Sequence, residues 1–281
     1  MREIKKSKRI KRLFAIIFIL AILMIIFYIN DIKYAGNFVK LKNDISNFFN
    51  SSYNNTKSEL VLERNNGKII YGENQYSRIH PASLSKLFTI AYALEIEKDM
   101  DKMVEVKRET LDLVPRNSSL SNIEVGEYRF EDIIAAILIP SGNDASYVLA
   151  DYIGGILNPK LINTDERIDL FIRNLNEYIE KEGYKSTKIY SPCGFDNESK
   201  SNFVDLKNLC NSLLDKKIIR NLVDKYQYEI ESSMGKITTL ENTNLFLNPN
   251  CKLYNKYIKG IKTGTIANCN NLIILYDNND R

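Results

Sequence analysis

The sequence predicts an α+β fold in which one antiparallel β-sheet is covered by a cluster of helices. Strand-like segments with turn residues between them lie near residue 60 and again after residue 225, and helical patterns fill the region between them. Strands that are separated in sequence from the helices are typical of α+β domains. With 281 residues, of which 44% are hydrophobic, the chain is long enough to bury a large core.

The N-terminus predicts a membrane anchor. Residues 1–12 hold seven basic side chains and one acidic side chain, and residues 13–29 contain no charged residue. As a helix, the apolar run is about 25 Å long, which is near the minimum for crossing a bilayer. Because basic residues mark the cytoplasmic end of a membrane helix, we expect a cytoplasmic tail at 1–12 and an uncleaved, single-pass transmembrane anchor at 13–29. The rest of the chain then lies outside the cytoplasm at the cell membrane; a cleaved signal peptide is the alternative interpretation.

The elements after this anchor follow in order. Apolar residues recur every three or four positions in 37–50, which predicts an amphipathic helix, and a polar connector follows it, so that 30–57 links the anchor to a domain at 58–281. AsnAsnGly at 65–67 separates two short strand patterns and predicts a β-hairpin. The patterns predict helices at 83–97, 130–139, 145–154, 168–183 and 203–214, and strands at 59–64, 68–71, 227–231, 237–240, 260–265 and 272–276.

Composition narrows the possible functions. The net charge of +4 comes from the first residues, so the rest of the chain is slightly acidic and no nucleic-acid partner is expected. His80 is the only histidine, which argues against zinc sites built on paired histidines and leaves one candidate base for a Ser-His-Asp site. We interpret His80 as a loop residue. The four cysteines can pair in three ways, but free thiols are the expected state in a domain of this size.

The first motif with chemical meaning is S-x-x-K at 83–86. On a helix, Ser83 and Lys86 share a face, so the amine can reach the hydroxyl. A serine needs an adjacent base to act as a nucleophile at neutral pH, and a lysine can be that base when burial keeps it uncharged. Alone, the motif is weak, because many solvated helices carry it by chance.

The second motif is Ser141-Gly142-Asn143, in a polar turn after the apolar helix at 130–139. Such a turn can point two side chains into a cleft, where Ser141 could relay a proton and the Asn143 amide could hold a backbone amide of a substrate. Taken alone, an ordinary helix–helix turn is the better explanation of this pattern.

The third motif is Lys262, Thr263, Gly264 and Thr265 at the end of a predicted strand. A cation and two hydroxyls on a strand edge suit an extended peptide that ends in a carboxylate and adds to the strand by backbone pairing. Gly264, which lacks a Cβ, would let that peptide approach closely. Alone, this motif is also weak.

Together, the order and spacing of the three motifs make a strong signal. S-x-x-K, a Ser-x-Asn element and K-T-G are the signature of penicillin-binding proteins and class A β-lactamases. Over about residues 59–276, the chain resembles the low-molecular-mass penicillin-binding proteins, which are serine-type D-alanyl-D-alanine carboxypeptidases. The hairpin at 63–74, the helix that starts with the second motif and the segment at 242–247 also resemble this family.

The resemblance implies a fold like that of β-lactamases and penicillin-binding proteins. It also implies removal of the terminal D-Ala from peptidoglycan stem peptides during cell-wall synthesis, with β-lactams as covalent inhibitors. In this interpretation Ser83 is the acylated nucleophile, Lys86 is its base and Ser141 relays the proton. The implied substrate-binding residues are Asn143, Lys262, Thr263, Gly264 and Thr265, and the backbone N–H groups of Ser83 and Thr265 form an oxyanion hole. Neither a metal nor an organic cofactor is implied.

Two features depart from the family pattern. Ser191-Pro192-Cys193-Gly194 stands where family members have Asn-Pro-His-Gly, which puts the role of that histidine in doubt. The chain also ends at Arg281, whereas the family continues with a helix and with a strand that lies between the first strand and the strand after the third motif. We therefore expect residues 1–281 to be a truncated form of a longer protein, or the N-terminal hairpin to pair directly with 272–276.

Three other functions stay open. A β-lactamase needs a base that directs water onto the acyl-enzyme, usually from a Glu-x-x-Leu-Asn segment, and no such string lies between Asn143 and Lys262. A non-hydrolytic sensor of β-lactams or peptidoglycan usually has a cytoplasmic or multi-span effector, whereas the predicted cytoplasmic tail is very short. A catalytically inactive scaffold is the third possibility, and the three intact motifs argue against it.

Overall fold

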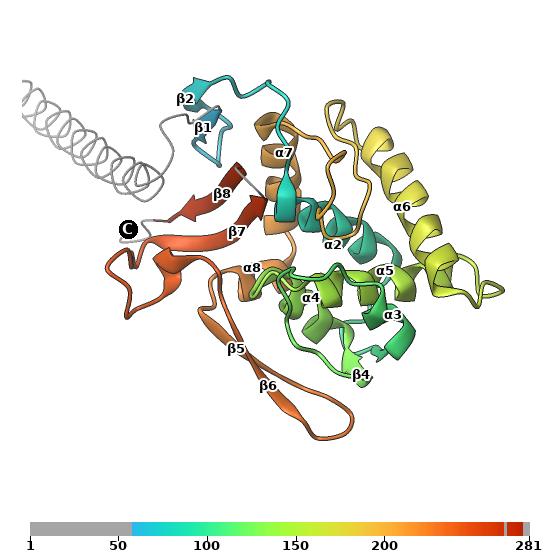
Figure 1. The fold of residues 1–281 in the computed structure, drawn as a ribbon. Coiled ribbons are helices and arrows are strands. Elements are labelled where there is room, and N and C mark those ends of the chain that lie inside the picture. The colour runs from blue at the N-terminus through green and yellow to red at the C-terminus, as the bar shows by residue number, and fades with distance from the viewer. Residues whose placement is uncertain (1–57, 267–268, 278–281) are drawn as a thin grey trace, which may run out of the picture. The chain divides into compact units, whose positions relative to one another are not determined.

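The computed structural model of the chain describes residues 58–266 and 269–277 (Figure 1). The chain divides into two compact units, Met1–Asn55 and Thr56–Arg281, and the described residues belong to the second. The predicted cytoplasmic tail, membrane anchor and amphipathic helix lie outside the described residues. Among the residues that are described, no helix is long and apolar enough to cross a membrane.

The described part has an α+β fold, as predicted, with a cluster of helices next to several β-hairpins (Figure 1). The helices are η1 (Ala82–Leu84), α2 (Ser85–Ile96), α3 (Arg108–Asp112), α4 (Phe130–Leu138), α5 (Asn143–Leu157), α6 (Thr164–Lys181), α7 (Phe203–Leu214), α8 (Lys217–Val223) and η2 (Leu245–Leu247). The strands are β1 (Glu59–Leu62), β2 (Ile69–Glu73), β3 (Met103–Val106), β4 (Gly126–Arg129), β5 (Gln227–Glu231), β6 (Ile237–Glu241), β7 (Ile258–Ile266) and β8 (Cys269–Tyr276).

The strands do not form the single sheet that the sequence led us to expect. The described strands pair as four separate two-stranded antiparallel sheets, β1–β2, β3–β4, β5–β6 and β7–β8. The hairpin predicted at AsnAsnGly 65–67 is confirmed as β1–β2. Pairing of this hairpin with 272–276, one of the two alternatives, is wrong, because β1–β2 and β7–β8 are separate sheets. Pairing between neighbours in sequence closes short loops and so costs less chain entropy than pairing across two hundred residues.

Helix α2 is the centre of the helical cluster. All of its residues from Ser85 to Leu94 are buried, and it contacts α4, α5, α6 and α7 (Figure 1). A helix that is apolar on every face is buried on every face, and here Ser85, Lys86 and Thr89 are the polar exceptions to the apolar pattern. These three side chains therefore lie in the dry interior, where polar groups need internal partners.

The helices predicted within the described residues are confirmed, most of them with shifted ends. Helix α6 begins after Asn163, whose side chain accepts from the backbone N–H of Glu166 at 3.0 Å, and α7 begins after Asn202, which accepts from Asp205 N at 2.7 Å. These are asparagine N-caps, which satisfy backbone donors of the first helical turn. The prediction missed β3, β4, α3 and α8, because elements of four to seven residues are too short to show a period.

The cysteines that the structure describes with their side chains are free thiols, as expected. They are Cys193, Cys210 and Cys251. Cys193 is 1% exposed and belongs to the segment that departs from the family pattern, so its surroundings matter for the site.

Candidate active site

Ser83 and Lys86 lie together at the start of the buried helix. Ser83 belongs to the short helix η1, which runs directly into α2, so the two residues are one turn apart. Lys86 Nζ donates to Ser83 Oγ at 2.9 Å. Ser83 is partly exposed, whereas Lys86 has no exposed surface. The hydroxyl can therefore meet a ligand from outside while its prospective base stays dry.

The surroundings of Lys86 favour its uncharged form. Burial lowers the pKa of Lys86 to about 8, against the opposing influence of Cys193 and Asp144. Lys86 Nζ also donates to Asn143 Oδ1 at 2.5 Å and to the Cys193 carbonyl at 3.2 Å. A lysine with a pKa near neutrality carries a free lone pair in a substantial fraction of molecules, which is what a general base for a serine requires.

The second motif reaches the first through Asn143. Asn143 is the first residue of α5, and its backbone N–H donates to the Ser119 carbonyl at 2.8 Å. The side chain thereby points its oxygen at Lys86. Ser141 is 4% exposed and has a φ of +64°, and its hydroxyl makes no hydrogen bond to another described residue. Asn143 is thus hydrogen-bonded to Lys86, whereas Ser141 lies in the turn just before α5.

The third motif lies on β7. Lys262 is 2% exposed and donates to the Thr263 carbonyl at 3.0 Å. Burial lowers the pKa of Lys262 well below its usual value, and the nearby charge of Lys86 lowers it further. The two lysines are thus close enough to influence each other. Thr263 Oγ1 shares a hydrogen bond of 2.6 Å with Thr243 Oγ1, whereas Thr265 is exposed at the edge of the hairpin.

Gly264 has a different neighbour from the one expected. The sequence suggested that a glycine there lets a peptide substrate approach. A Cβ at this position would instead lie 2.9 Å from the Pro81 carbonyl oxygen and 3.2 Å from the backbone nitrogens of Ser83 and Leu84. Gly264 therefore lets strand β7 lie directly against the turn that carries Ser83, and this contact brings the first and third motifs together.

The segment 191–196 also contributes to the site, although no role for its side chains was predicted. The Pro192 carbonyl accepts from Thr89 Oγ1 at 2.8 Å, and the next carbonyl, that of Cys193, accepts from Lys86. Gly194 has a φ of +73°, and a Cβ there would lie 2.0 Å from the Ala82 carbonyl oxygen. The departure from the family pattern at 191–194 indicates that this segment is unusual, but it does not reveal which side chains its backbone groups contact.

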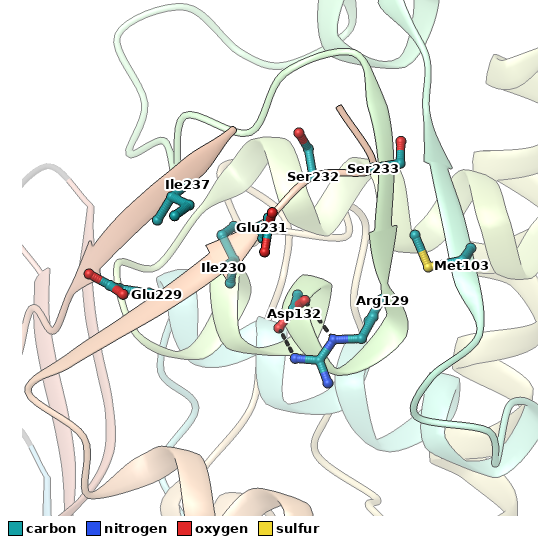
Figure 2. Close-up of a pocket in the computed structure, with 9 residues that line it drawn as sticks. All are labelled: Met103, Arg129, Asp132, Glu229, Ile230, Glu231, Ser232, Ser233 and Ile237. Carbon is teal, nitrogen blue, oxygen red and sulfur yellow. Dashed lines mark hydrogen bonds and ion pairs between the residues drawn. The ribbon is translucent and has the colours of Figure 1, made fainter. Parts of the chain in front are cut away.

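A pocket elsewhere in the domain is separate from this site. Figure 2 shows it between the β5–β6 hairpin and the β4–α4 junction, with Arg129 bonded to Asp132 through Nε at 3.0 Å and Nη2 at 2.9 Å. The motif residues do not line it. Within the described ranges, no group of three His, Cys, Asp or Glu side chains is placed to hold a metal ion.

A family comparison agrees with this arrangement. The family model for D-alanyl-D-alanine carboxypeptidases matches residues 49–279, which include the three motifs and the segment at 191–196. The motifs S-x-x-K, Ser-x-Asn and K-T-G are the signature of penicillin-binding enzymes, and here the structure brings Ser83, Lys86, Asn143 and Lys262 close together. This chain belongs to the D-alanyl-D-alanine carboxypeptidase family.

Individual relatives support the same assignment. D-alanyl-D-alanine carboxypeptidase DacF of Bacillus subtilis is 28% identical over 211 residues, which cover 74% of this chain and 50% of that protein. D-alanyl-D-alanine carboxypeptidase DacC of Escherichia coli is 27% identical over 218 residues, with coverage of 74% and 50%. The chain therefore spans about half the length of these relatives.

Solved structures show the same fold. The Streptomyces K15 DD-transpeptidase matches with a TM-score of 0.67 and 22% identity, covering 78% of this chain and 84% of that one. Penicillin-binding protein D2 from Listeria monocytogenes, in an ampicillin-bound form, matches with a TM-score of 0.60 and 24% identity, covering 79% and 84%. The chain thus has the α+β fold of penicillin-binding proteins.

Proposed function

We propose that this chain is a serine-type D-alanyl-D-alanine carboxypeptidase that removes the terminal D-Ala from peptidoglycan stem peptides. The observation that carries the proposal is the 2.9 Å contact between Ser83 Oγ and the buried Lys86 Nζ. The matched family and the relatives named above have this activity in their names.

The first half of the reaction is acylation. With Lys86 uncharged, Nζ takes the proton of Ser83 Oγ, and the oxygen attacks the carbonyl carbon of the penultimate D-Ala. The oxyanion that forms accepts from the backbone N–H groups of Ser83 and Thr265, and each such donor is typically worth a factor of about 10²–10³ in rate. The amide C–N bond then breaks, and D-Ala leaves with the proton that Lys86 held, with Ser141 as the relay.

The second half of the reaction is hydrolysis of the acyl-enzyme. Water gives a proton to Lys86 and adds to the ester carbonyl, and the ester C–O bond breaks as Ser83 recovers its proton. The shortened stem peptide leaves with a new carboxylate. A β-lactam enters the same acylation step through its strained amide and stays attached through Ser83.

Lys262 and Thr265 bind the carboxylate end of the substrate. Lys262 is buried beside Lys86, and both features disfavour its charge. A substrate carboxylate beside Lys262 would offset this cost, because an opposite charge restores the protonated form. Thr265 is exposed on the same strand and can donate its hydroxyl to that carboxylate, while Asn143 retains an amide N–H₂ for a backbone carbonyl of the peptide.

The test is release of D-Ala from a diacyl-L-Lys-D-Ala-D-Ala peptide by the full-length chain in detergent, with Ser83→Ala as the control. We expect steady release by the wild-type chain and none by the variant. Faster hydrolysis of nitrocefin than of the peptide would favour a β-lactamase. Covalent labelling by penicillin without turnover of the peptide would favour a sensor, and transfer of the acyl group to an added amine would indicate a transpeptidase.

We also propose that residues 13–29 anchor the catalytic domain to the outer face of the cell membrane. The proposal is supported by the uncharged apolar run and by the basic residues before it. A reporter that is active only outside the cytoplasm, fused after residue 60, should be active. Recovery of a soluble mature form that begins near residue 35 would indicate a cleaved signal peptide instead.

A further inference from the structure

His80 contacts the turn that carries the nucleophile. The backbone N–H of Ala82 donates to His80 Nδ1 at 3.0 Å. Ala82 is completely buried and has a φ of +50°, a left-handed conformation that is unfavourable for a residue with a Cβ. The imidazole therefore holds a strained residue in place directly before Ser83.

The segment around His80 is fixed on two sides. Ile79 exchanges backbone hydrogen bonds of 2.9 and 3.0 Å with Ser201. From β8, Asn271 Nδ2 donates to the His80 carbonyl at 2.9 Å and to the Pro81 carbonyl at 3.2 Å. With its backbone held in this way and its side chain 21% exposed, His80 presents its ring to the turn in one orientation.

The other ring nitrogen of His80 faces Asp196, with Nε2 3.9 Å from Oδ1. Asp196 accepts from Ser191 Oγ at 2.8 Å and from Ser199 Oγ at 2.7 Å. Burial would raise the pKa of Asp196, but the nearby His80 ring and the hydrogen bonds from Ser199 and Ser191 outweigh it and hold the pKa well below its usual range. The carboxylate is therefore ionised, and it favours the tautomer of His80 that carries its proton on Nε2.

The same carboxylate is linked to the base. Ser191 Oγ, which donates to Asp196, accepts from the backbone N–H of Gly194 at 3.0 Å, and the neighbouring Cys193 carbonyl contacts Lys86. The other titratable groups around Asp196 are the Cys193 thiol and Tyr147 of α5; η1 contributes backbone groups, and β8 contributes the neutral Asn271. Asp196 is thus linked in two directions. Through His80 it is linked to the turn that carries Ser83, and through Ser191 and Gly194 it is linked to the segment whose Cys193 carbonyl accepts from Lys86.

We propose that uncharged His80, protonated on Nε2, is a positioning residue for acylation of Ser83, and that Asp196 selects this tautomer. The inference rests on the proposed peptidase chemistry. When His80 binds a second proton, on Nδ1, the buried N–H of Ala82 loses its acceptor. The turn can then relax from its left-handed conformation, and Ser83 moves out of line with Lys86.

The kinetic test is the acylation rate of the full-length chain in detergent by benzylpenicillin, measured from about pH 5 to pH 9. Protonation of Lys86, with its pKa of about 8, should lower the rate constant about tenfold per pH unit below that value. Asp196→Asn should lower the rate constant at every pH, because the His80 ring then loses the carboxylate that selects its tautomer.

Two substitutions at position 80 separate positioning from a merely structural role. His80→Asn places an amide oxygen near the position of Nδ1, where it can accept from the Ala82 N–H, so this variant should keep most of the wild-type rate. His80→Ala removes the acceptor and should lower the rate constant about tenfold or more at every pH. If His80→Asn is as slow as His80→Ala, the proposal is wrong.

A second measurement does not depend on activity. Because the chain has one histidine, labelling with ¹⁵N-histidine gives one imidazole in the NMR spectrum. We expect the Nε2-protonated tautomer near neutral pH, and a mixture of tautomers or an Nδ1-protonated ring would overturn the proposal. If the chain does not react with benzylpenicillin, the proposed function fails, while this spectrum still decides where the proton of His80 lies.

Discussion

Lys86 acquires its reactivity from the helix that carries it. A lysine on a solvated helix is charged at neutral pH, whereas α2 is surrounded by other helices, and burial lowers the pKa of Lys86 to about 8. Ser83 Oγ, Asn143 Oδ1 and the Cys193 carbonyl satisfy its protons. Burial of Lys86 lowers the free energy of unfolding at neutral pH, because the folded state disfavours a charge that the unfolded state carries freely.

Lys86→Met tests this cost. Between about pH 8 and pH 10.5 the unfolded wild-type chain binds a proton that the folded chain does not, so wild-type stability should rise with pH across this window. The full gain is roughly 3 kcal/mol, and the variant should lack it. The measurement is the free energy of unfolding in denaturant for both proteins at about pH 7 and pH 10.5. A wild-type-to-variant difference that stays constant with pH would show that burial does not shift the pKa of Lys86.

At the scale of residues, contacts between neighbours in sequence could be predicted, whereas contacts between residues far apart in sequence could not. Ser83 and Lys86 are three positions apart, so a helical pattern alone brings them together. Asn271, which holds the loop before the nucleophile, lies 191 positions from His80. His80 was interpreted as an ordinary loop residue, because nothing in its neighbourhood in the sequence reveals that Ala82 and Asp196 contact its ring.

At the scale of elements, the site depends on two close backbone approaches to the nucleophile turn. Strand β7 approaches it at Gly264, and the segment 191–196 approaches it at Gly194. The motif predicts that Gly264 faces the substrate, but it contains no information on packing, and packing decides which surface the backbone of a strand faces. Long periodic elements such as α6 and α7 were predicted well, because their apolar faces repeat over several turns.

Gly264→Ala tests the first approach. The new Cβ would lie 2.9 Å from the Pro81 carbonyl, so strand or turn must shift by a few tenths of an ångström, and small displacements of reacting groups can cost about 10²-fold in rate. We expect acylation by benzylpenicillin to slow about a hundredfold and stability to fall by about 1–3 kcal/mol. Acylation at the wild-type rate in the folded variant would mean that the contact between β7 and η1 does not set the position of Ser83.

Substitutions at two adjacent glycines of α5, Gly154 and Gly155, test how closely α5 packs on α6. A Cβ at Gly154 would lie 2.2 Å from the backbone carbonyl oxygen of Arg167, whereas a Cβ at Gly155 would meet the guanidinium end of the Arg167 side chain at 3.2 Å. Gly154→Ala should therefore destabilise the fold by about 3 kcal/mol. Gly155→Ala should stay within about 1 kcal/mol of wild type, because alanine favours the helix and the arginine can move. Equal losses in urea unfolding would contradict this account.

At the scale of the whole molecule, the fold class was predictable and the number of sheets was not. Runs of strands and helices indicate α+β from the sequence alone, and the solved relatives share that fold. AsnAsnGly at 65–67 also predicted the β1–β2 hairpin. Whether such pairs join into one sheet depends on contacts between segments that are far apart in sequence, and the described strands form separate two-stranded sheets. The pocket in Figure 2 is lined by residues of other elements and by none of the motif residues, so it does not mark the candidate site.

The molecule as a whole has one task in this account: to hold Ser83 ready for acylation. The most direct test is the intact mass of the full-length chain after reaction with benzylpenicillin, followed by proteolysis and mapping of the modified peptide. The account predicts one penicilloyl group per chain, attached at Ser83 and absent from Ser83→Ala, with Ser85→Ala labelled normally as the neighbouring control. A penicilloyl group on Ser85 or Ser141, or an adduct that survives in Ser83→Ala, would contradict it.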